Sequence, residues 1–281
     1  MTRTALLAAL AMTMLAANSL LTRAGVLDGT DPLAFAAIRV GAGAVVLALL
    51  VRGRVPVAVS RLGAAAALVV YLLGFSLAYR TLDAGLGALI LFGTVQVALL
   101  GTGLVLGERF GALRWAGMAV ASLGLGWLLW PDDAAGAPVD VALMVAAGLG
   151  WAAYTYAGRG EPSPLGATAA NFVLGTGLMA LTLPLWWGAP VTSVGAVWAV
   201  ASGAVTSGLG YALLYRVLPR MGVAAAGVMQ LSAPVIAVVG GAVLLGEAVT
   251  PRMLGAGALV LAGIGLAVSG AVQGTIRSKG S

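Results

Sequence analysis

The stretch that decides the fold runs from residue 211 to residue 270 and reads YALLYRVLPRMGVAAAGVMQLSAPVIAVVGGAVLLGEAVTPRMLGAGALVLAGIGLAVSG. It divides into three apolar runs. One ends at a tyrosine pair, one is interrupted by Pro234 and ends at Gly246-Glu247, and one opens at Thr250-Pro251. Runs of about 20 apolar residues are long enough to cross a bilayer as helices. The stretch therefore indicates a membrane protein.

An earlier segment, from Phe75 to about Leu129, has the same landmarks in the same order. The offset between the two copies drifts by only about three residues, so we interpret them as one unit used twice. Chance self-similarity in a chain rich in Ala, Gly and Leu is the alternative. The matching positions are Tyr79-Arg80 with Tyr215-Arg216, Leu82 with Leu218, Gly85 with Gly222, Gly107-Glu108 with Gly246-Glu247, Arg114 with Arg252 and Gly117 with Gly255.

The composition points to the same class of protein. Of the 281 residues, 61% are hydrophobic and only 9% are charged, whereas soluble domains have roughly a quarter of their residues charged. The chain has no Cys and no His, which excludes thiol and imidazole chemistry and the common zinc sites. We therefore expect no catalytic residues, no metal and no cofactor. The net charge of +6 is typical of basic cytoplasmic loops in a membrane protein, so we expect no nucleic-acid partner.

Short polar breaks divide the chain into ten predicted spans. We predict an all-α membrane protein on this basis. The first run could instead be a cleaved signal peptide, because Arg3 precedes it. The predicted spans are residues 5–21, 33–51, 62–82, 86–106, 113–130, 139–157, 165–186, 194–218, 221–245 and 253–270, with an acidic linker at 131–138.

The loop charges orient these spans. Most loop Arg and Lys residues fall on one side, which the positive-inside rule makes the cytoplasm. Both termini are then cytoplasmic. Because five spans per copy is an odd number, the second copy must enter the membrane upside down, and inverted repeats place a substrate site near the midplane. We predict repeats at residues 1–134 and 135–272, around a central cavity, and a cytoplasmic tail at residues 273–281.

Polar residues inside the spans are costly in lipid and therefore informative. Every carboxylate lies at a predicted span end or in a loop, so no acidic proton relay is visible. The one charge well inside a run is Arg39. It either lines a cavity and meets an anionic group, or it snorkels outward or pairs with Asp31 or Asp28; we favour the second interpretation.

Uncharged polar and aromatic residues on the central spans form the candidate site. Tyr71, Phe75 and Tyr79 recur every four residues, which places them on one helical face. Each polar residue could instead stabilise the packing between neighbouring helices, and for Tyr79 we favour a place in an interfacial aromatic belt. An aromatic face with a few amides suits a neutral or zwitterionic solute. The candidate substrate-binding residues are Asn18, Tyr71, Tyr79, Phe92, Gln96, Trp151, Tyr154, Ser207, Tyr211 and Gln230.

Pro234 is the candidate hinge. It has no N–H, so the carbonyl of Gln230, four residues earlier, loses its helical partner. A free carbonyl at membrane depth is tolerated where protein or water satisfies it. A simple kink that shapes packing is the alternative.

Three motifs carry a resemblance to a known family. These are DPLAFAAIR at residues 31–39, GWAAYTY at 150–156 and LSAPVIAVVGGAVLLGE at 231–247. With the ten-span pattern, they resemble the drug/metabolite transporter superfamily, and especially EamA-type exporters such as the bacterial aromatic and neutral amino-acid exporters. The resemblance implies alternating access around a cavity built from helices one, three, four, six, eight and nine, with helices five and ten peripheral.

The resemblance also implies a function and a location. We expect an inner-membrane exporter of amino acids or related small metabolites, whose partners are its solute and the membrane lipids. Because no carboxylate is predicted at mid-membrane depth, we expect the solute to move down its own concentration gradient. Otherwise its transport is coupled to an energy source without an acidic proton relay. A lipid or lipid-linked sugar flippase of the same superfamily is the alternative. An intramembrane lipid-modifying enzyme is a third reading, which the absent His and Cys argue against.

Overall fold

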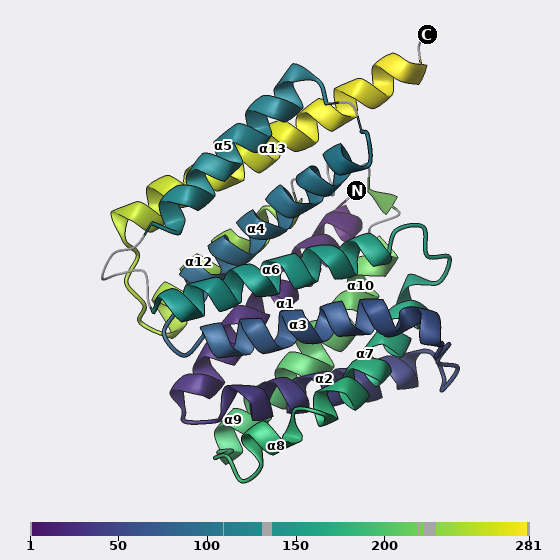
Figure 1. The fold of residues 1–281 in the computed structure, drawn as a ribbon, viewed down its shortest axis with the longest axis vertical. Coiled ribbons are helices and arrows are strands. Elements are labelled where there is room, and N and C mark those ends of the chain that lie inside the picture. The colour runs from purple at the N-terminus through teal and green to yellow at the C-terminus, as the bar shows by residue number, and fades with distance from the viewer. Residues whose placement is uncertain (1, 109, 131–136, 218–219, 222–228, 280–281) are drawn as a thin grey trace.

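The chain folds into a helical bundle, shown in Figure 1 as a computed structural model. The structure describes residues 2–108, 110–130, 137–217, 220–221 and 229–279, and every regular element in these ranges is a helix. The elements are α1 (Thr2–Leu27), α2 (Pro32–Leu50), η1 (Val59–Arg61), α3 (Leu62–Ala78), α4 (Ala84–Val105), α5 (Ala112–Leu128), α6 (Pro138–Ala157), α7 (Pro164–Ala180), α8 (Leu183–Trp186), α9 (Ser193–Ala201), η2 (Ser202–Leu209), α10 (Gly210–Val217), α12 (Ser232–Leu244) and α13 (Pro251–Lys279).

Seven helical segments in the described residues are long and apolar enough to cross a membrane, so this is a multi-pass membrane protein. They are α1, α2, η1 with α3, α4, α6, α9 to α10, and α13. The other three predicted spans correspond to α5 and α7, each 17 residues long, and to α12, of which 13 residues are described. Part of the predicted linker (131–136) and the start of the ninth predicted span (222–228) lie outside the described residues.

Local sequence explains where several helices begin and end. Asp31 caps α2, because its Oδ1 accepts hydrogen bonds from the backbone N–H groups of the next turn, and proline follows at the first helical position. Ser163 precedes Pro164 in the same pattern, but its side chain makes no capping bond. Gly107 and Gly246 follow the ends of α4 and α12 with positive φ values of 81° and 69°. These are the left-handed positions that glycine adopts without strain.

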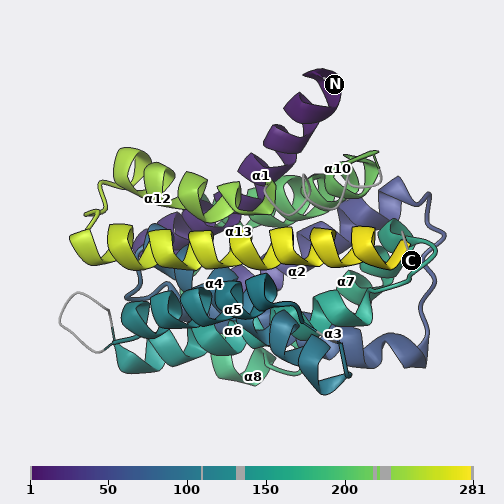
Figure 2. The ribbon, with the colours of Figure 1, turned by 90° about the horizontal axis from the view of Figure 1, so that it is seen from above.

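The helices are arranged in three groups (Figure 1). α5 and α13 lie side by side at one edge, and α2, α7, α8 and α9 lie at the opposite edge. Between them are α1, α3, α4, α6, α10 and α12. Figure 2 shows that the N-terminal end of α1 projects beyond the bundle. α13 runs to Lys279, so the helix continues through most of the segment that the sequence assigned to a tail.

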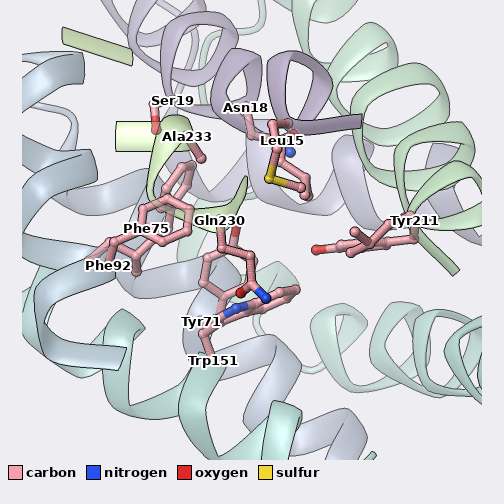
Figure 3. A pocket seen from close by; sticks show the side chains of 13 residues that line it. Leu15, Asn18, Ser19, Tyr71, Phe75, Phe92, Trp151, Tyr211, Gln230 and Ala233 are labelled. Carbon is pink, nitrogen blue, oxygen red and sulfur yellow. The ribbon is translucent and has the colours of Figure 1, made fainter. Parts of the chain in front are cut away.

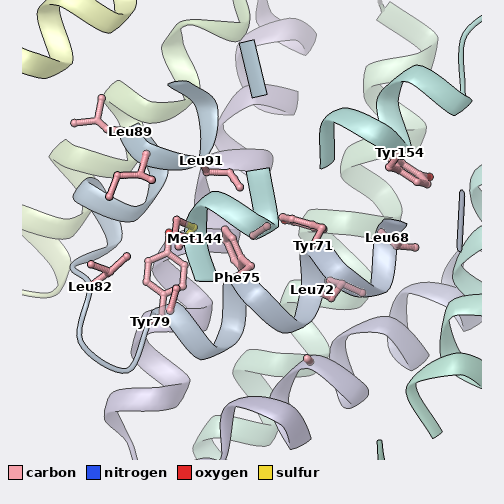
Figure 4. Packing of buried hydrophobic residues seen from close by; sticks show 14 of the residues in the cluster. Leu68, Tyr71, Leu72, Phe75, Tyr79, Leu82, Leu89, Leu91, Met144 and Tyr154 are labelled. Atoms are coloured by element: carbon pink, nitrogen blue, oxygen red, sulfur yellow. The ribbon is translucent and has the colours of Figure 1, made fainter. Parts of the chain in front are cut away.

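Two glycines let α3 and α6 approach closely. A Cβ at Gly74 would lie 2.5 Å from the carbonyl oxygen of Leu143, and one at Gly150 would lie 2.8 Å from the backbone N of Tyr71. Small residues permit such close helix contacts in membranes, where dispersion packing replaces the hydrophobic drive. Figure 4 shows the resulting core, in which the α3 side chains pack against Met144 and the leucines of α4. The contact brings Trp151 beside the aromatic face of α3.

Candidate functional site

One cavity lies among the central helices, and Figure 3 shows the side chains around it. Its empty volume is about 600 Å³, including the space at its mouth. The wall is contributed by α1, α3, α4, α6, α10 and α12 together with Gln230. The lining residues are Met12, Leu15, Asn18, Ser19, Tyr71, Phe75, Leu91, Phe92, Trp151, Tyr211, Leu214, Gln230 and Ala233.

The cavity brings together a majority of the residues that the sequence singled out. They come from segments more than 200 residues apart along the chain, at Asn18 and Gln230. The predicted residues in the wall are Asn18, Tyr71, Phe92, Trp151, Tyr211 and Gln230. The predicted residues that do not line it are Tyr79, Gln96, Tyr154 and Ser207.

Tyr79 and Tyr154 are buried beside the cavity, not in its wall. Tyr79 is fully buried, with its ring edge-on to Phe75 at 4.8 Å between centroids and its hydroxyl 3.4 Å from the carbonyl oxygen of Ala84. It is therefore not part of an exposed interfacial belt either. The Tyr154 hydroxyl donates to Thr168 Oγ1 at 3.3 Å. Each ring packs against a ring of the wall, Tyr79 against Phe75 and Tyr154 against Trp151.

Gln96 is half-buried on α4, one helical turn beyond Phe92. One turn of an α-helix advances about 5.4 Å along its axis. Phe92 reaches the cavity and Gln96 does not, so the open space ends between these two positions. Phe92 and Gln96 share a helical face, as the sequence indicated, but of these two only Phe92 reaches the cavity wall.

Aromatic rings form a continuous wall from α3 to α10. The ring centroids of Phe75 and Tyr71 are 5.2 Å apart, those of Tyr71 and Trp151 are 4.9 Å apart, and those of Trp151 and Tyr211 are 5.7 Å apart. Such distances lie within the favourable range for paired aromatic rings. The four-residue spacing on α3 supplies one part of this wall, and the glycine contact between α3 and α6 supplies the junction with Trp151.

A polar cluster surrounds Asn18 at the other side of the cavity. Its Oδ1 accepts hydrogen bonds from the hydroxyls of Ser202, Thr206 and Ser207 at 2.8, 2.6 and 3.3 Å. Ser202 and Thr206 were not singled out from the sequence, although their four-residue spacing places them on one helical face. These hydroxyls belong to η2, a π-helical segment. π-Helical turns interrupt α-helices frequently at functional sites.

The ninth predicted span is interrupted just before Pro234. Residues 229–230 are helical, Leu231 is in a turn, and α12 begins at Ser232. Pro234 therefore lies in the first turn of α12, where a missing N–H costs little. The Gln230 side chain reaches the cavity from the residue before the turn. The break thus lies at Leu231, three residues earlier than the proline.

The expectation that Arg39 snorkels or pairs with Asp31 or Asp28 was wrong. Arg39 is completely buried, and its Nη2 donates to the hydroxyl oxygen of Tyr71 at 2.8 Å. Its guanidinium carbon lies 5.4 Å from the ring centroid of Tyr71 and 5.0 Å from that of Phe75. The carboxylate of Asp31 caps α2 instead. Packing of α2 against its neighbours in the bundle holds the guanidinium inside.

The acidic groups of the described residues lie outside the cavity. Glu247 accepts a hydrogen bond from the backbone N–H of Ala84 at 2.8 Å and forms an ion pair with Arg23 at 3.7 Å, at the N-terminus of α4. Burial raises the pKa of Glu247 above its ordinary value. None of the lining residues is a carboxylate, and the described residues contain no cluster of three or more metal-ligating side chains. The cavity is suited to enclosing a small solute with an apolar part.

Three comparisons place the chain among known proteins. Residues 140–269 match the EamA-like transporter family. Over 269 residues the chain is 45% identical to the uncharacterized protein PA1977 of Pseudomonas aeruginosa, and the match covers 94% of this chain and 94% of that one. A protein of known crystal structure is 19% identical and superposes with a TM-score of 0.61, covering 94% of this chain and 97% of that one. At this identity the likeness concerns the fold alone.

Proposed function

Because this chain belongs to the EamA-like transporter family, we propose that it exports neutral or aromatic amino acids, or related small metabolites, by alternating access. The observation that carries the proposal is the central cavity, whose wall is contributed by both halves of the chain. A site shared by two halves changes shape when one half moves against the other, which is what alternating access requires.

The chemistry of the cavity supports a solute of this class. Trp151, Tyr211 and Phe92 present aromatic surface, which packs favourably against the ring or aliphatic side chain of a solute. Asn18 and Gln230 add amide groups that can orient its polar end. Small sites that bind a solute through an apolar wall and a few polar groups are the common design for neutral and zwitterionic ligands.

The pairing of helices supports two inverted repeats. We infer one repeat at residues 1–134 and the other at 135–272, which together supply ten spans. α2 packs against α7, α4 against α12 and α5 against α13, so helices at the same position in each copy meet. α3 packs against α6, and α1 packs against α10 in the matching way. This pattern is expected of a pseudo-two-fold axis in the membrane plane.

The proposal also covers how the chain is oriented in the membrane and how transport is coupled to energy. The excess of basic loops on one side supports cytoplasmic termini and insertion in a bacterial inner membrane. Transport would proceed as a rocking of the two repeats, with the turn at Leu231 absorbing part of the motion. Since the described residues of the cavity wall include no carboxylate, we propose downhill movement, or coupling that does not use an acidic proton relay.

Counterflow in liposomes tests the proposal. Vesicles with the purified protein, preloaded with phenylalanine or threonine, should accumulate the labelled amino acid. Trp151→Leu removes an aromatic surface from the cavity and should slow counterflow at least about fivefold, since a lost aromatic pair costs about 1 kcal/mol beyond the lost area. Trp130→Leu is the matched control, because Trp130 is 70% exposed. No counterflow for any amino acid, or equal loss in both variants, would refute the proposal; strict dependence on a pH gradient would refute its coupling part.

A lipid or lipid-linked sugar flippase is the second candidate, and one feature favours it. An apolar groove with an empty volume of about 780 Å³ runs between α1 and α12. Its wall includes Leu20, Val239 and Leu244, and among the described lining residues only Thr13 carries a hydroxyl. Such a surface fits an acyl chain. Protein-dependent movement of a fluorescent phospholipid between leaflets, with no amino-acid counterflow, would favour this function over the first.

A further inference from the structure

Arg39 carries a charge that the described part of the protein does not neutralise. The side chain is completely buried, and none of the ion pairs formed by the described residues includes it. Its Nε and Nη1 find no hydrogen-bond partner among the residues that the structure describes. An unpaired buried cation is expensive in a low-dielectric interior. Its presence next to a cavity therefore indicates that a mobile anion completes the site.

The guanidinium is joined to the cavity through two aromatic rings. It packs against Tyr71 and Phe75, and both rings line the cavity. Because the Tyr71 oxygen accepts a hydrogen bond from Arg39 Nη2, its own hydroxyl hydrogen remains free to donate. Among the described residues nothing accepts that hydrogen. The charge behind the phenol makes the hydroxyl a stronger donor than an isolated tyrosine.

A second donor is available in the same cavity. Asn18 uses its Oδ1 to accept hydrogen bonds from three hydroxyls. Its Nδ2 donates to none of the described residues. Tyr71 and Asn18 both line the cavity. The hydrogen-bond donors that their hydroxyl and amide leave without a partner among the described residues match a group that only accepts hydrogen bonds, such as a carboxylate.

We propose that the solute carries a carboxylate, which binds to the Tyr71 hydroxyl while Arg39 supplies the compensating positive charge from behind the ring. This inference rests on the proposed function, because it names the chemical class of the transported solute. Tyr71 touches the solute, and Arg39 is a positioning residue that acts through it. Carboxylic acids and zwitterions bind, whereas neutral amides bind weakly and amines without a carboxylate are repelled by the buried cation.

A binding experiment with matched probes tests this. The detergent-purified protein is titrated with 3-phenylpropionate, 3-phenylpropionamide and phenethylamine, and thermal stabilisation reports binding. The three probes share a ring and differ in the polar end. We expect 3-phenylpropionate to bind at least about tenfold more tightly than the amide, since a hydrogen bond to a charged group is worth about a tenfold change in affinity. Phenethylamine should bind most weakly.

Tyr71→Phe is the decisive variant, because it keeps the ring in the wall and removes only the hydroxyl. It should abolish the difference between acid and amide, and Arg39→Gln should do the same. If Arg39→Gln does not fold, Tyr71→Phe alone carries the test. Tyr156→Phe and Arg54→Gln, which make the same chemical changes at exposed positions, should keep the difference.

The outcomes separate this inference from the proposed function. Acid-over-amide preference in the wild type with no amino-acid counterflow would leave the carboxylate site standing and overturn the exporter. Counterflow of phenylalanine, combined with equal binding of acid and amide, would overturn the carboxylate site. It is also overturned if the preference survives in Tyr71→Phe, or if none of the probes binds.

Discussion

Asn18→Leu should destabilise the protein more than any other exchange of a buried amide among its described residues. Asn18 is 3% exposed, and its Oδ1 is the shared acceptor of three hydroxyls on η2. Leucine has a similar volume but no acceptor. The substitution therefore leaves these hydroxyls facing an apolar side chain, at the junction of α1 with η2.

The magnitude follows from the number of bonds. Hydrogen bonds between membrane helices contribute about 0.6 kcal/mol each on average, and up to about 1.7 kcal/mol. Loss of three such bonds lowers the free energy of unfolding by about 2 kcal/mol. Thr206 keeps a second acceptor, the carbonyl oxygen of Ser202 at 2.9 Å, which holds the loss nearer to this value than to the upper limit.

Unfolding by SDS in mixed micelles, followed by circular dichroism, measures the effect. Asn171→Leu is the matched control, because Asn171 is also buried in a helix and its Oδ1 accepts no hydrogen bond from any described residue. This control should lose at most about 0.6 kcal/mol, the average for one bond. Adding Thr206→Val to Asn18→Leu should cost less than the sum of the two single changes, because the two residues share a hydrogen bond. Equal losses for the two leucine variants, or strictly additive effects with Thr206→Val, would refute the reasoning.

Three further predictions use the same unfolding assay. Gly150→Leu should prevent stable packing of α3 on α6, because its Cβ would lie 2.8 Å from the backbone N of Tyr71; a monodisperse, stable variant would contradict this. Burial raises the folded-state pKa of Glu247, so wild-type stability should fall as pH rises from the ordinary carboxyl pKa of 4.5 through the folded value. Glu247→Gln should remove that slope, and an unchanged slope would show that another group titrates. Arg80→Gln should cost about 1–2 kcal/mol, because it leaves the buried carboxylate of Asp140 without its cation; adding Asp140→Asn should recover part of the loss.

Much of the fold could be predicted from the sequence, because the length and apolar character of a run of neighbouring residues indicate a membrane helix. The second predicted span, 33–51, is shifted by one residue from α2, and the sixth, 139–157, begins one residue later than α6. The family resemblance that three short motifs indicated is confirmed. The aromatic face of α3 also follows from spacing alone, since residues four apart share a helical face. Each of these inferences depends on neighbours in the chain.

The candidate site was predicted less completely, and Arg39 and Tyr79 show why. Both were placed near a membrane surface, and both are completely buried. Helices that are apolar all round, as these are, have no polar stripe to indicate which face turns inward. The choice of face is made by contacts between distant segments, such as that of Gly150 with Tyr71.

The sequence by itself determined that the chain crosses a membrane many times, where its helices run, and that its acids lie away from their middles. Only the tertiary structure decided that Tyr71, Trp151 and Tyr211 share one wall, and that a buried arginine stands behind it. The physical reason is that a span needs only length and apolar character, which are local. A cavity instead needs particular side chains from separate helices to meet, and close packing at small residues controls that meeting.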